Sequence, residues 1–389
     1  MSRFQMLFNY GFRIFFLSAA LYAVALMILW LGNLTQGWPV AGVWPLAWHA
    51  HEMVHGLVAA AIAGFLLTAV PNWTGTGRLH GRGLCLLWLL WLSGRLGFGF
   101  LDPYTNSAAA WIAWLVDLAF LPALAATIAV PLIRTGNRRN AVMILLLIAL
   151  ATTNLLHGLP ASNAAATRFA LDLVTVLMAV IGGRITPAFT RNWLIRNQIA
   201  GPLPHSHPWL DRAAIASLVL VAITSLVVPH APVLGWLCGL AGGLHLWRLA
   251  AWRGWRAASD PLLWVLHLGY AWIIVGLCLR AAGILTDAVP VTAWYHAIGA
   301  GAMATLILGV MARVALGHTG RELRLQAGGI WIFVLITAAA LARVVMALGI
   351  GSGGLLLWVA GLCWIGAFTL YLALYIPILS APRVDGRPG

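Results

Sequence analysis

The feature that most constrains this chain is a series of twelve long apolar segments joined by short polar turns. A helix that crosses the hydrocarbon core of a bilayer needs about 20 consecutive, mostly apolar residues. By that criterion the segments cover residues 12–33, 48–70, 82–100, 108–133, 138–159, 164–190, 209–229, 233–253, 260–282, 290–313, 327–348 and 353–379. We therefore predict an all-α polytopic membrane protein with twelve transmembrane helices. We expect a single transmembrane domain over residues 1–389, with the lipid bilayer as its main partner.

The composition supports this interpretation. Hydrophobic residues make up 62% of the chain and charged residues only 8%, whereas soluble domains carry about 25% charged residues. Neither an ordinary soluble domain nor a disordered chain has this composition. The net charge of +14 comes entirely from arginine, because the chain has no lysine. In a membrane protein such an excess indicates loop charges, so no nucleic-acid partner is expected. The four separate cysteines indicate neither a disulfide nor a thiolate metal site.

Nineteen of the 23 arginines fall at the ends of the chain or in alternate connections between the predicted helices. They are Arg3, Arg13, Arg78, Arg82, Arg134, Arg138, Arg139, Arg184, Arg191, Arg196, Arg212, Arg248, Arg253, Arg256, Arg313, Arg321, Arg324, Arg383 and Arg387. If the chain crosses the bilayer twelve times, all of them lie on one side. By the positive-inside rule that side is the cytoplasm, and both termini are cytoplasmic. The first segment is then a retained helix and not a cleaved signal peptide.

The other four arginines, Arg95, Arg168, Arg280 and Arg343, fall inside predicted helices. With this topology all four lie in the outer third of the membrane. A single arginine at that depth can extend its side chain to the outer head groups. Four at a similar depth favour a shared anionic partner, because the guanidinium group pairs well with carboxylates.

The chain has 12 histidines, more than its nine acidic residues. His49 and His51 open the second predicted helix, and His296 lies near the outer end of the tenth. His51 and His55 share a helix face because they are four residues apart. Ionisable residues inside a membrane are costly and usually functional. We therefore expect bound groups near these side chains in the outer half of the membrane.

A second set of histidines is predicted to lie deeper. His245 and His267 are at similar depths in the eighth and ninth helices, so their rings could meet, and His318 ends the tenth helix. Neutral imidazole is a common ligand for iron, copper and zinc. Two histidines on facing helices can bind a haem iron, and two or three can bind copper. A lone histidine in a membrane can instead form hydrogen bonds between helices.

The chain also contains a weak internal repeat. When it is aligned on itself with an offset of 245 residues, His51 matches His296, Gly64 matches Gly309, and residues 74–75 match residues 319–320. The sixth predicted helix carries a related ending at residues 182–187 but no histidine. Helices two, six and ten would be equivalent in a threefold repeat of four helices.

This arrangement is similar to the twelve-helix catalytic subunit of haem-copper oxidases, in which helices two and ten supply the axial histidines of a haem. By that resemblance His51 and His296 become a haem pair. The oxidases also have a copper trio on helices six and seven, where this chain has no internal histidine.

A closer resemblance covers almost the whole chain. Residues 49–53 (HAHEM) and 63–75 (AGFLLTAVPNWTG) resemble the NnrS family. So do residues 116–120 (VDLAF), 182–184 (GGR), 266–272 (LHLGYAW) and 315–321 (ALGHTGR). The resemblance implies a membrane protein of the bacterial inner membrane that contains haem b and copper and is linked to nitric oxide and nitrosative stress. The motifs themselves define no reaction.

The leading hypothesis is a haem and copper redox protein that acts on nitric oxide. His51 and His296 would bind haem axially, with His49 nearby, and Arg95, Arg280 and Arg343 would hold the propionates. His245, His267 and His318 would hold copper or a second haem. Glu52 and Asp117 would orient imidazoles or transfer protons. The alternatives are a transporter or metal-handling permease and a nitric oxide sensor without turnover. The electron donor and the oligomeric state are not predicted.

Overall fold

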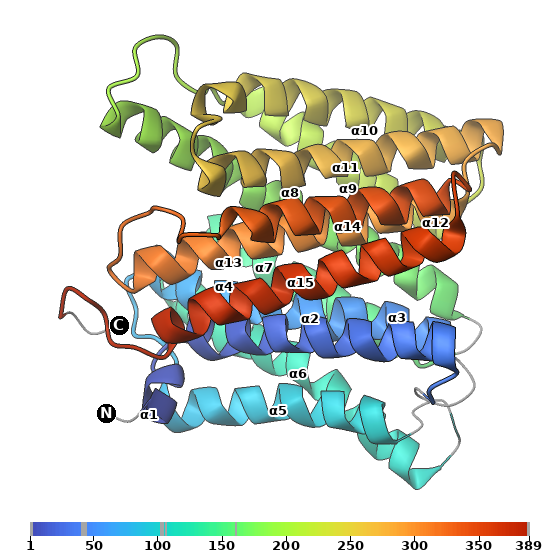
Figure 1. Cartoon of the computed structure of the whole chain (residues 1–389), viewed down its shortest axis with the longest axis horizontal. Helices are drawn as coiled ribbons and strands as arrows, with labels where there is room; N and C mark the ends of the chain where they lie inside the picture. Colours follow the sequence, from blue (N-terminus) through green and yellow to red (C-terminus); the bar gives the residue numbers. More distant parts are fainter. Residues whose placement is uncertain (1–2, 40–44, 102–104, 106, 160–161, 387–389) are drawn as a thin grey trace. The chain divides into compact units, whose positions relative to one another are not determined.

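The computed structural model describes the chain except residues 1–2, 40–44, 102–104, 106, 160–161 and 387–389. Arg387, one of the predicted loop arginines, therefore lies outside the described residues. Within the described residues the regular structure is entirely helical. Twelve helices in this described part of the chain are long and apolar enough to cross a membrane. The prediction of an all-α polytopic membrane protein with twelve transmembrane helices is confirmed (Figure 1).

The helical elements follow one another along the chain, with η1 and η4 π-helical and η3 a 3₁₀ turn. They are α1 (Arg3–Leu7), α2 (Gly11–Gln36), α3 (Pro45–His51), η1 (Glu52–Val58), α4 (Ala59–Thr74), α5 (Gly81–Phe100), α6 (Ala108–Arg134), α7 (Arg138–His157), α8 (Asn163–Arg196), α9 (Pro208–Val227), α10 (Pro232–Ala251), η3 (Gly254–Ala257), α11 (Pro261–Thr286), α12 (Val291–His296), η4 (Ala297–Met303), α13 (Ala304–His318), α14 (Ile330–Ala347) and α15 (Gly353–Leu379).

Local sequence explains where several helices begin and end. The Ser107 hydroxyl accepts a hydrogen bond from the Ala110 amide and caps α6. The Asp260 carboxylate caps α11 in the same way, and Pro261 follows it at the first helical position. Helix α2 ends at Gly37 in the left-handed conformation (φ 68°), which glycine adopts without steric cost.

The chain forms two compact units, which we describe separately. The first comprises residues 1–170, 311–322 and 368–389. In it α2 packs on α4 and η1, α5 packs on α6, and α6 packs on α7. Figure 1 shows α2 and α5, in blue and cyan, on neighbouring paths. All the residues of the buried charge cluster described below belong to this unit.

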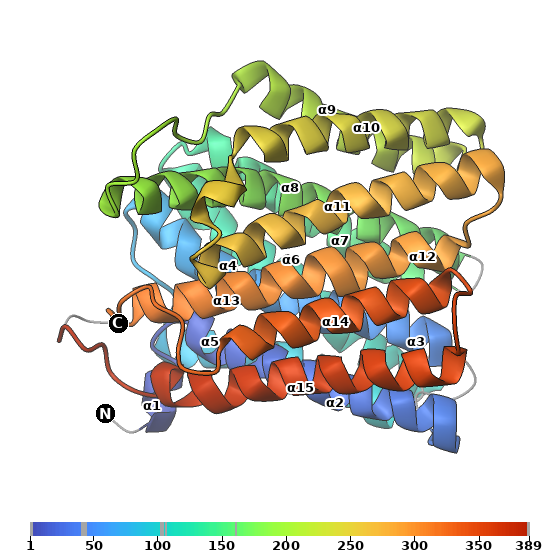
Figure 2. The same cartoon turned by 45° about the horizontal axis from the view of Figure 1, so that its top comes forward.

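The second unit comprises residues 171–310 and 323–367. Helix α10 packs on both α9 and α11, and α11 packs on α12 and η4. Figure 2 shows α9, α10 and α11 running side by side. Helix α14 packs on α12 and η4. The prediction that the whole chain is a single domain is not tested by this division.

The two π-helical segments occupy matching positions. Segment η1 begins at Glu52, directly after His51, and segment η4 begins at Ala297, directly after His296. Each is 7 residues long, and the offset between them equals the 245 residues of the sequence alignment. A π-helical segment is rare and is often found at functional sites. This match supports the repeat of helices two and ten, whereas the threefold repeat stays a prediction.

Candidate functional site

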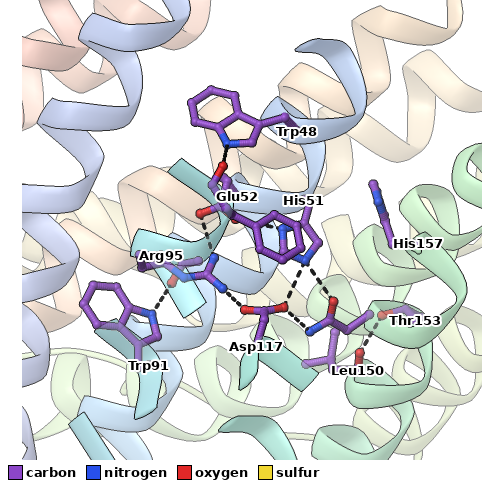
Figure 3. A network of polar contacts seen from close by, with 12 residues as sticks. Trp48, His51, Glu52, Trp91, Arg95, Asp117, Leu150, Thr153 and His157 are labelled. Carbon is purple, nitrogen blue, oxygen red and sulfur yellow. Dashed lines mark hydrogen bonds and ion pairs between the residues drawn. The ribbon is translucent and has the colours of Figure 1, made fainter. Parts of the chain in front are cut away.

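His51 is the last residue of α3 and lies in the interior of the first unit. Its side chain is fully buried. The imidazole stacks on the Phe98 ring, with centroids 4.1 Å apart and an interplanar angle of 10°. The Trp114 indole meets it edge-on at 5.4 Å. The Trp48 indole donates to the Phe98 carbonyl at 3.2 Å and so closes the aromatic surroundings of the imidazole (Figure 3).

Both ring nitrogens of His51 face acceptor oxygens. Nδ1 lies 2.8 Å from Glu52 Oε1, and Nε2 lies 2.8 Å from Asn154 Oδ1 and 3.2 Å from Asp117 Oδ2. The Asn154 amide is oriented by its own bond, because Nδ2 donates to Asp117 Oδ2 at 2.7 Å. An imidazole that donates from both nitrogens is the protonated form. The geometry therefore fits a cationic His51.

Arg95 lies between the two carboxylates of this cluster (Figure 3). Its Nη1 donates to Glu52 Oε2 at 2.7 Å, and its Nη2 pairs with Asp117 Oδ1. All four side chains are buried. With a protonated His51, two cations balance two carboxylates, as burial of charge requires. We call His51, Glu52, Arg95 and Asp117 the charge cluster.

Glycines make the close approach of these groups possible. A Cβ atom on Gly56 would lie 2.7 Å from Arg95 Nη1 and 2.9 Å from Glu52 Oε2. A Cβ atom on Gly94 would lie 2.9 Å from Asp117 Oδ1. The Gly56 carbonyl also accepts from the Trp91 indole at 3.0 Å (Figure 3).

Two further residues complete the cluster and were not predicted. Tyr22 donates its hydroxyl to Glu52 Oε2, and Asn154 joins His51 to Asp117. Asn154 is an amide inside an apolar predicted helix, and that polarity was the available signal. Glu52 orients His51 as predicted. Arg95, predicted to hold a propionate, is paired with two carboxylates here.

His49 lies near the charge cluster but faces a different surface. Its ring stacks on the Trp30 indole, with centroids 4.2 Å apart and an interplanar angle of 13°.

His318 also belongs to the first unit. Its ring packs against the Phe12 ring at 5.6 Å, and its carbonyl accepts from Arg383 Nη1 at 2.9 Å.

His296, in the second unit, differs from His51 in its hydrogen bonding. Its Nδ1 donates to the Thr292 carbonyl at 2.7 Å. That bond places the lone pair on Nε2, and Nδ1–Thr292 is the one hydrogen bond of the ring among the described residues. Helix α12, which ends at His296, packs on α14, which carries Arg343. None of the ion pairs within the described part of the chain involves Arg343.

Arg280, the third predicted propionate partner, is already neutralised. Its Nη1 donates to Asp172 Oδ1 at 2.6 Å, its Nη2 donates to Ser225 Oγ at 2.7 Å, and its guanidinium lies 4.2 Å from the Trp294 ring centre. Arg280, Asp172 and Trp294 border a small cavity in the second unit that is also lined by Thr175.

His245 takes part in a buried hydrogen-bonded chain. Its Nε2 donates to the Ala214 carbonyl at 3.0 Å, and its Nδ1 lies 2.6 Å from the Tyr270 hydroxyl. Arg248 donates to that hydroxyl at 2.8 Å and to Asp211 at 2.6 Å. A metal at His245 would have to displace one of these bonds.

His267 has a simpler environment. Its Nδ1 donates to the Leu263 carbonyl at 3.0 Å, and its Nε2 lies 3.5 Å from Thr190 Oγ1. A Cβ atom on Gly254 would come within 2.3 Å of the ring. His245 and His267 belong to the second unit and His318 to the first. Their shared metal site therefore stays a prediction, as does the pairing of His51 with His296.

The comparison with protein families decides the identity at the family level. The family model described as NnrS protein matches residues 6–383. The chain belongs to the NnrS family. No curated protein matches this NnrS chain. The charge cluster contains HAHEM residues together with Asp117 of the VDLAF motif, so two of the NnrS-like motifs meet at one buried site.

Proposed function

We propose that this NnrS protein is a haem- and copper-containing membrane protein that acts on or responds to nitric oxide. The proposal is carried by two observations on neighbouring helices, one at His296 and one at Arg343. His296 is a histidine whose Nε2 is open, and Arg343 is a cation without an ion pair among the described residues. His296 directly precedes the π-helical segment η4, and α14, the helix that carries Arg343, packs against η4.

The donor set of His296 fits a metal ligand. A ligating histidine usually donates its other ring N–H to a carbonyl or carboxylate, which fixes the tautomer and orients the ring. The Thr292 carbonyl does this for His296. His51 would first have to lose a proton and its bonds to Asn154 and Asp117. His296 is therefore the stronger candidate for the first iron ligand, and His51 stays the predicted second.

Arg343 is suited to bind a propionate at the edge of the same haem. Haem carries two propionates, and arginine pairs with carboxylates through parallel hydrogen bonds. Arg95 and Arg280 already neutralise carboxylates of this chain, whereas Arg343 has none within the described residues. Of the three predicted propionate partners, Arg343 alone could take a propionate without breaking an existing ion pair.

The bound haem would supply one-electron chemistry and, with one imidazole ligand, a coordination position for a diatomic ligand. The chain's own contribution would be to orient the imidazole through Thr292 and to balance charge through Arg343. Copper would be held by histidine as well. Reduction of nitric oxide to nitrous oxide would also take up one electron and one proton per molecule of nitric oxide.

Visible absorption of the purified full-length protein tests the proposal. We expect a haem spectrum with about one haem per chain in the wild type, and its loss or a large shift in His296→Ala. His230→Ala, which changes a loop histidine, is the matched control and should leave the spectrum unchanged. A wild type without haem after expression in haem-replete cells would refute the proposal.

Anaerobic mixing of the reduced protein with nitric oxide separates the remaining functions. Oxidation of the haem with release of nitrous oxide indicates a reductase. A stable spectral change without nitrous oxide indicates a sensor. Transport of a metal or solute into liposomes by haem-free protein would instead support the permease alternative.

A further inference from the structure

His55 is a buried histidine without hydrogen bonds. It lies in the π-helical segment η1, and its side chain is 2% exposed. Neither Nδ1 nor Nε2 has a hydrogen-bond partner among the residues that the structure describes. A neutral imidazole carries one donor and one lone pair, and buried polar groups of native proteins are almost always satisfied. A partner other than the described residues should therefore complete this site.

His157, the last residue of α7, is the nearest histidine with an available lone pair. Its Nε2 donates to Thr167 Oγ1 at 3.0 Å, and the Thr167 hydroxyl donates in turn to the Asn163 carbonyl at 3.0 Å. Its Nδ1 must then be the acceptor, and it receives a long hydrogen bond of 3.2 Å from the Asn163 amide. The ring is fully buried and oriented through Nε2, as the rings of ligating histidines are.

The ring centres of His55 and His157 are 6.2 Å apart, with an interplanar angle of 75°. A metal–nitrogen bond is about 2 Å long, so each imidazole centre lies roughly 3 Å from the ion it binds. Two imidazoles that share one ion with opposed nitrogens therefore have centres roughly 6 Å apart. The separation of these two rings matches one shared ion.

His51 is close to both rings, at 5.0 Å from His55 and 5.4 Å from His157. Its two nitrogens, however, both donate to the charge cluster, so it has no free lone pair. Within the described residues no three histidine, cysteine or acidic side chains are arranged to hold a metal. A site with only two histidine ligands does not suit zinc, which takes four ligands in structural sites. Imidazole also suits copper, and copper(I) is stable with two nitrogen ligands.

We propose that His55 and His157 bind one copper(I) ion, with Thr167 orienting His157 and with His51 remaining hydrogen-bonded in the charge cluster. Binding replaces the long Asn163 contact of His157 and satisfies one of the two unpartnered nitrogens of His55. This inference rests on the proposed function in one respect, the presence of copper. It assigns that copper to the first unit and leaves haem binding at His296 untouched.

The test is a titration of the full-length protein in detergent with copper(I), in competition with a chromophoric copper(I) chelator under anaerobic reducing conditions. All variants carry His205→Ala and His207→Ala, because these two loop rings lie 4.3 Å apart and could bind copper adventitiously. We expect one tightly bound copper per chain in this background. His55→Phe, which keeps a ring of similar size, should weaken binding at least 100-fold.

Two substitutions beside His157 separate a ligand from a structural histidine. Thr167→Val removes the orienting acceptor and should weaken copper binding about 10- to 100-fold. Asn163→Ala removes the competing donor and should leave binding unchanged or tighter. His230→Phe, which changes an exposed loop histidine in the same way, is the matched control and should bind copper as the background does.

The inference is wrong if His55→Phe keeps tight copper binding, or if the background binds no copper. Circular dichroism and gel filtration must show that each variant is folded. If Thr167→Val does not fold, the copper affinity of His55→Phe alone tests the copper site. The haem spectrum distinguishes the two proposals. His55→Phe should retain it while losing copper, and a protein that binds copper through His55 but contains no haem would refute only the proposed function.

Discussion

The guanidinium of Arg95 occupies the space that a side chain at Gly56 would need, since a Cβ atom there would lie 2.7 Å from Nη1. Gly56 lies in η1 and Arg95 in α5, so this contact sets how closely the two helices approach. The charge cluster depends on that approach, because Arg95 must reach both Glu52 and Asp117.

Gly56→Ala should therefore destabilise the protein by about 1–3 kcal/mol, the usual cost of overpacking. Gly99→Ala in α5 is the control, because a Cβ atom there meets nothing within 4 Å and alanine is the better helix former. It should be neutral or slightly stabilising. Thermal unfolding in detergent measures both, and equal effects of the two variants would contradict the packing argument.

Removal of Arg95 should be far more harmful than removal of an exposed arginine. Arg95→Met leaves Glu52 and Asp117 buried without their shared cation, and breaking a buried pair typically costs about 3–5 kcal/mol. Arg82→Met, at an exposed position, should change stability by less than about 0.5 kcal/mol.

Glu52→Gln in the Arg95→Met background tests whether charge is the cause. The double variant removes one cation and one anion, so it should be less destabilised than the sum of the two single variants. Denaturation of all four proteins under the same detergent conditions gives the interaction free energy. A value near zero would mean that Arg95 acts through packing alone.

Arg343 and Arg280 should behave differently when each is changed to glutamine. Arg343→Gln should weaken haem retention on the order of tenfold, equivalent to about 1.4 kcal/mol, with little effect on stability. Arg280→Gln should lower the stability of the protein, because it leaves Asp172 without its cation. Haem stoichiometry and unfolding temperature, measured on both variants, check this. Haem loss in Arg280→Gln without a change in stability would reverse the assignment.

The predicted orientation is open to a direct test. With 19 arginines on one side, both termini should be cytoplasmic. A green fluorescent protein fused after residue 389 should then fluoresce in cells of a bacterial host, whereas alkaline phosphatase fused there should be inactive. Phosphatase activity at the C-terminus would overturn the topology.

The fold could be predicted well from the sequence because each membrane crossing leaves a long apolar segment of its own. The predicted span 48–70, for example, corresponds to the helical stretch Pro45–Thr74. The site could be predicted only in part. The HAHEM and VDLAF motifs identified His51, Glu52 and Asp117, and these residues do meet.

The partners of individual atoms could not be predicted. Asn154 occupies Nε2 of His51, and the bond of His296 to Thr292 leaves Nε2 of His296 open. Both arrangements depend on side-chain positions across or along helices. Helical periodicity gives faces but not hydrogen-bond directions. It likewise gave no indication of the two π-helical segments.

Those segments bear on the history of the chain. The hydrogen bonds of a π-helix span one residue more than those of an α-helix, i→i+5 instead of i→i+4. A single residue inserted into an α-helix would therefore produce such a turn. Both helices that carry the matching histidines have it at the same place. If the two helices arose by duplication, as their alignment suggests, a single insertion before that duplication explains both π-helical turns. The widened turn would then be older than the divergence that left Glu52 in one copy and Ala297 in the other.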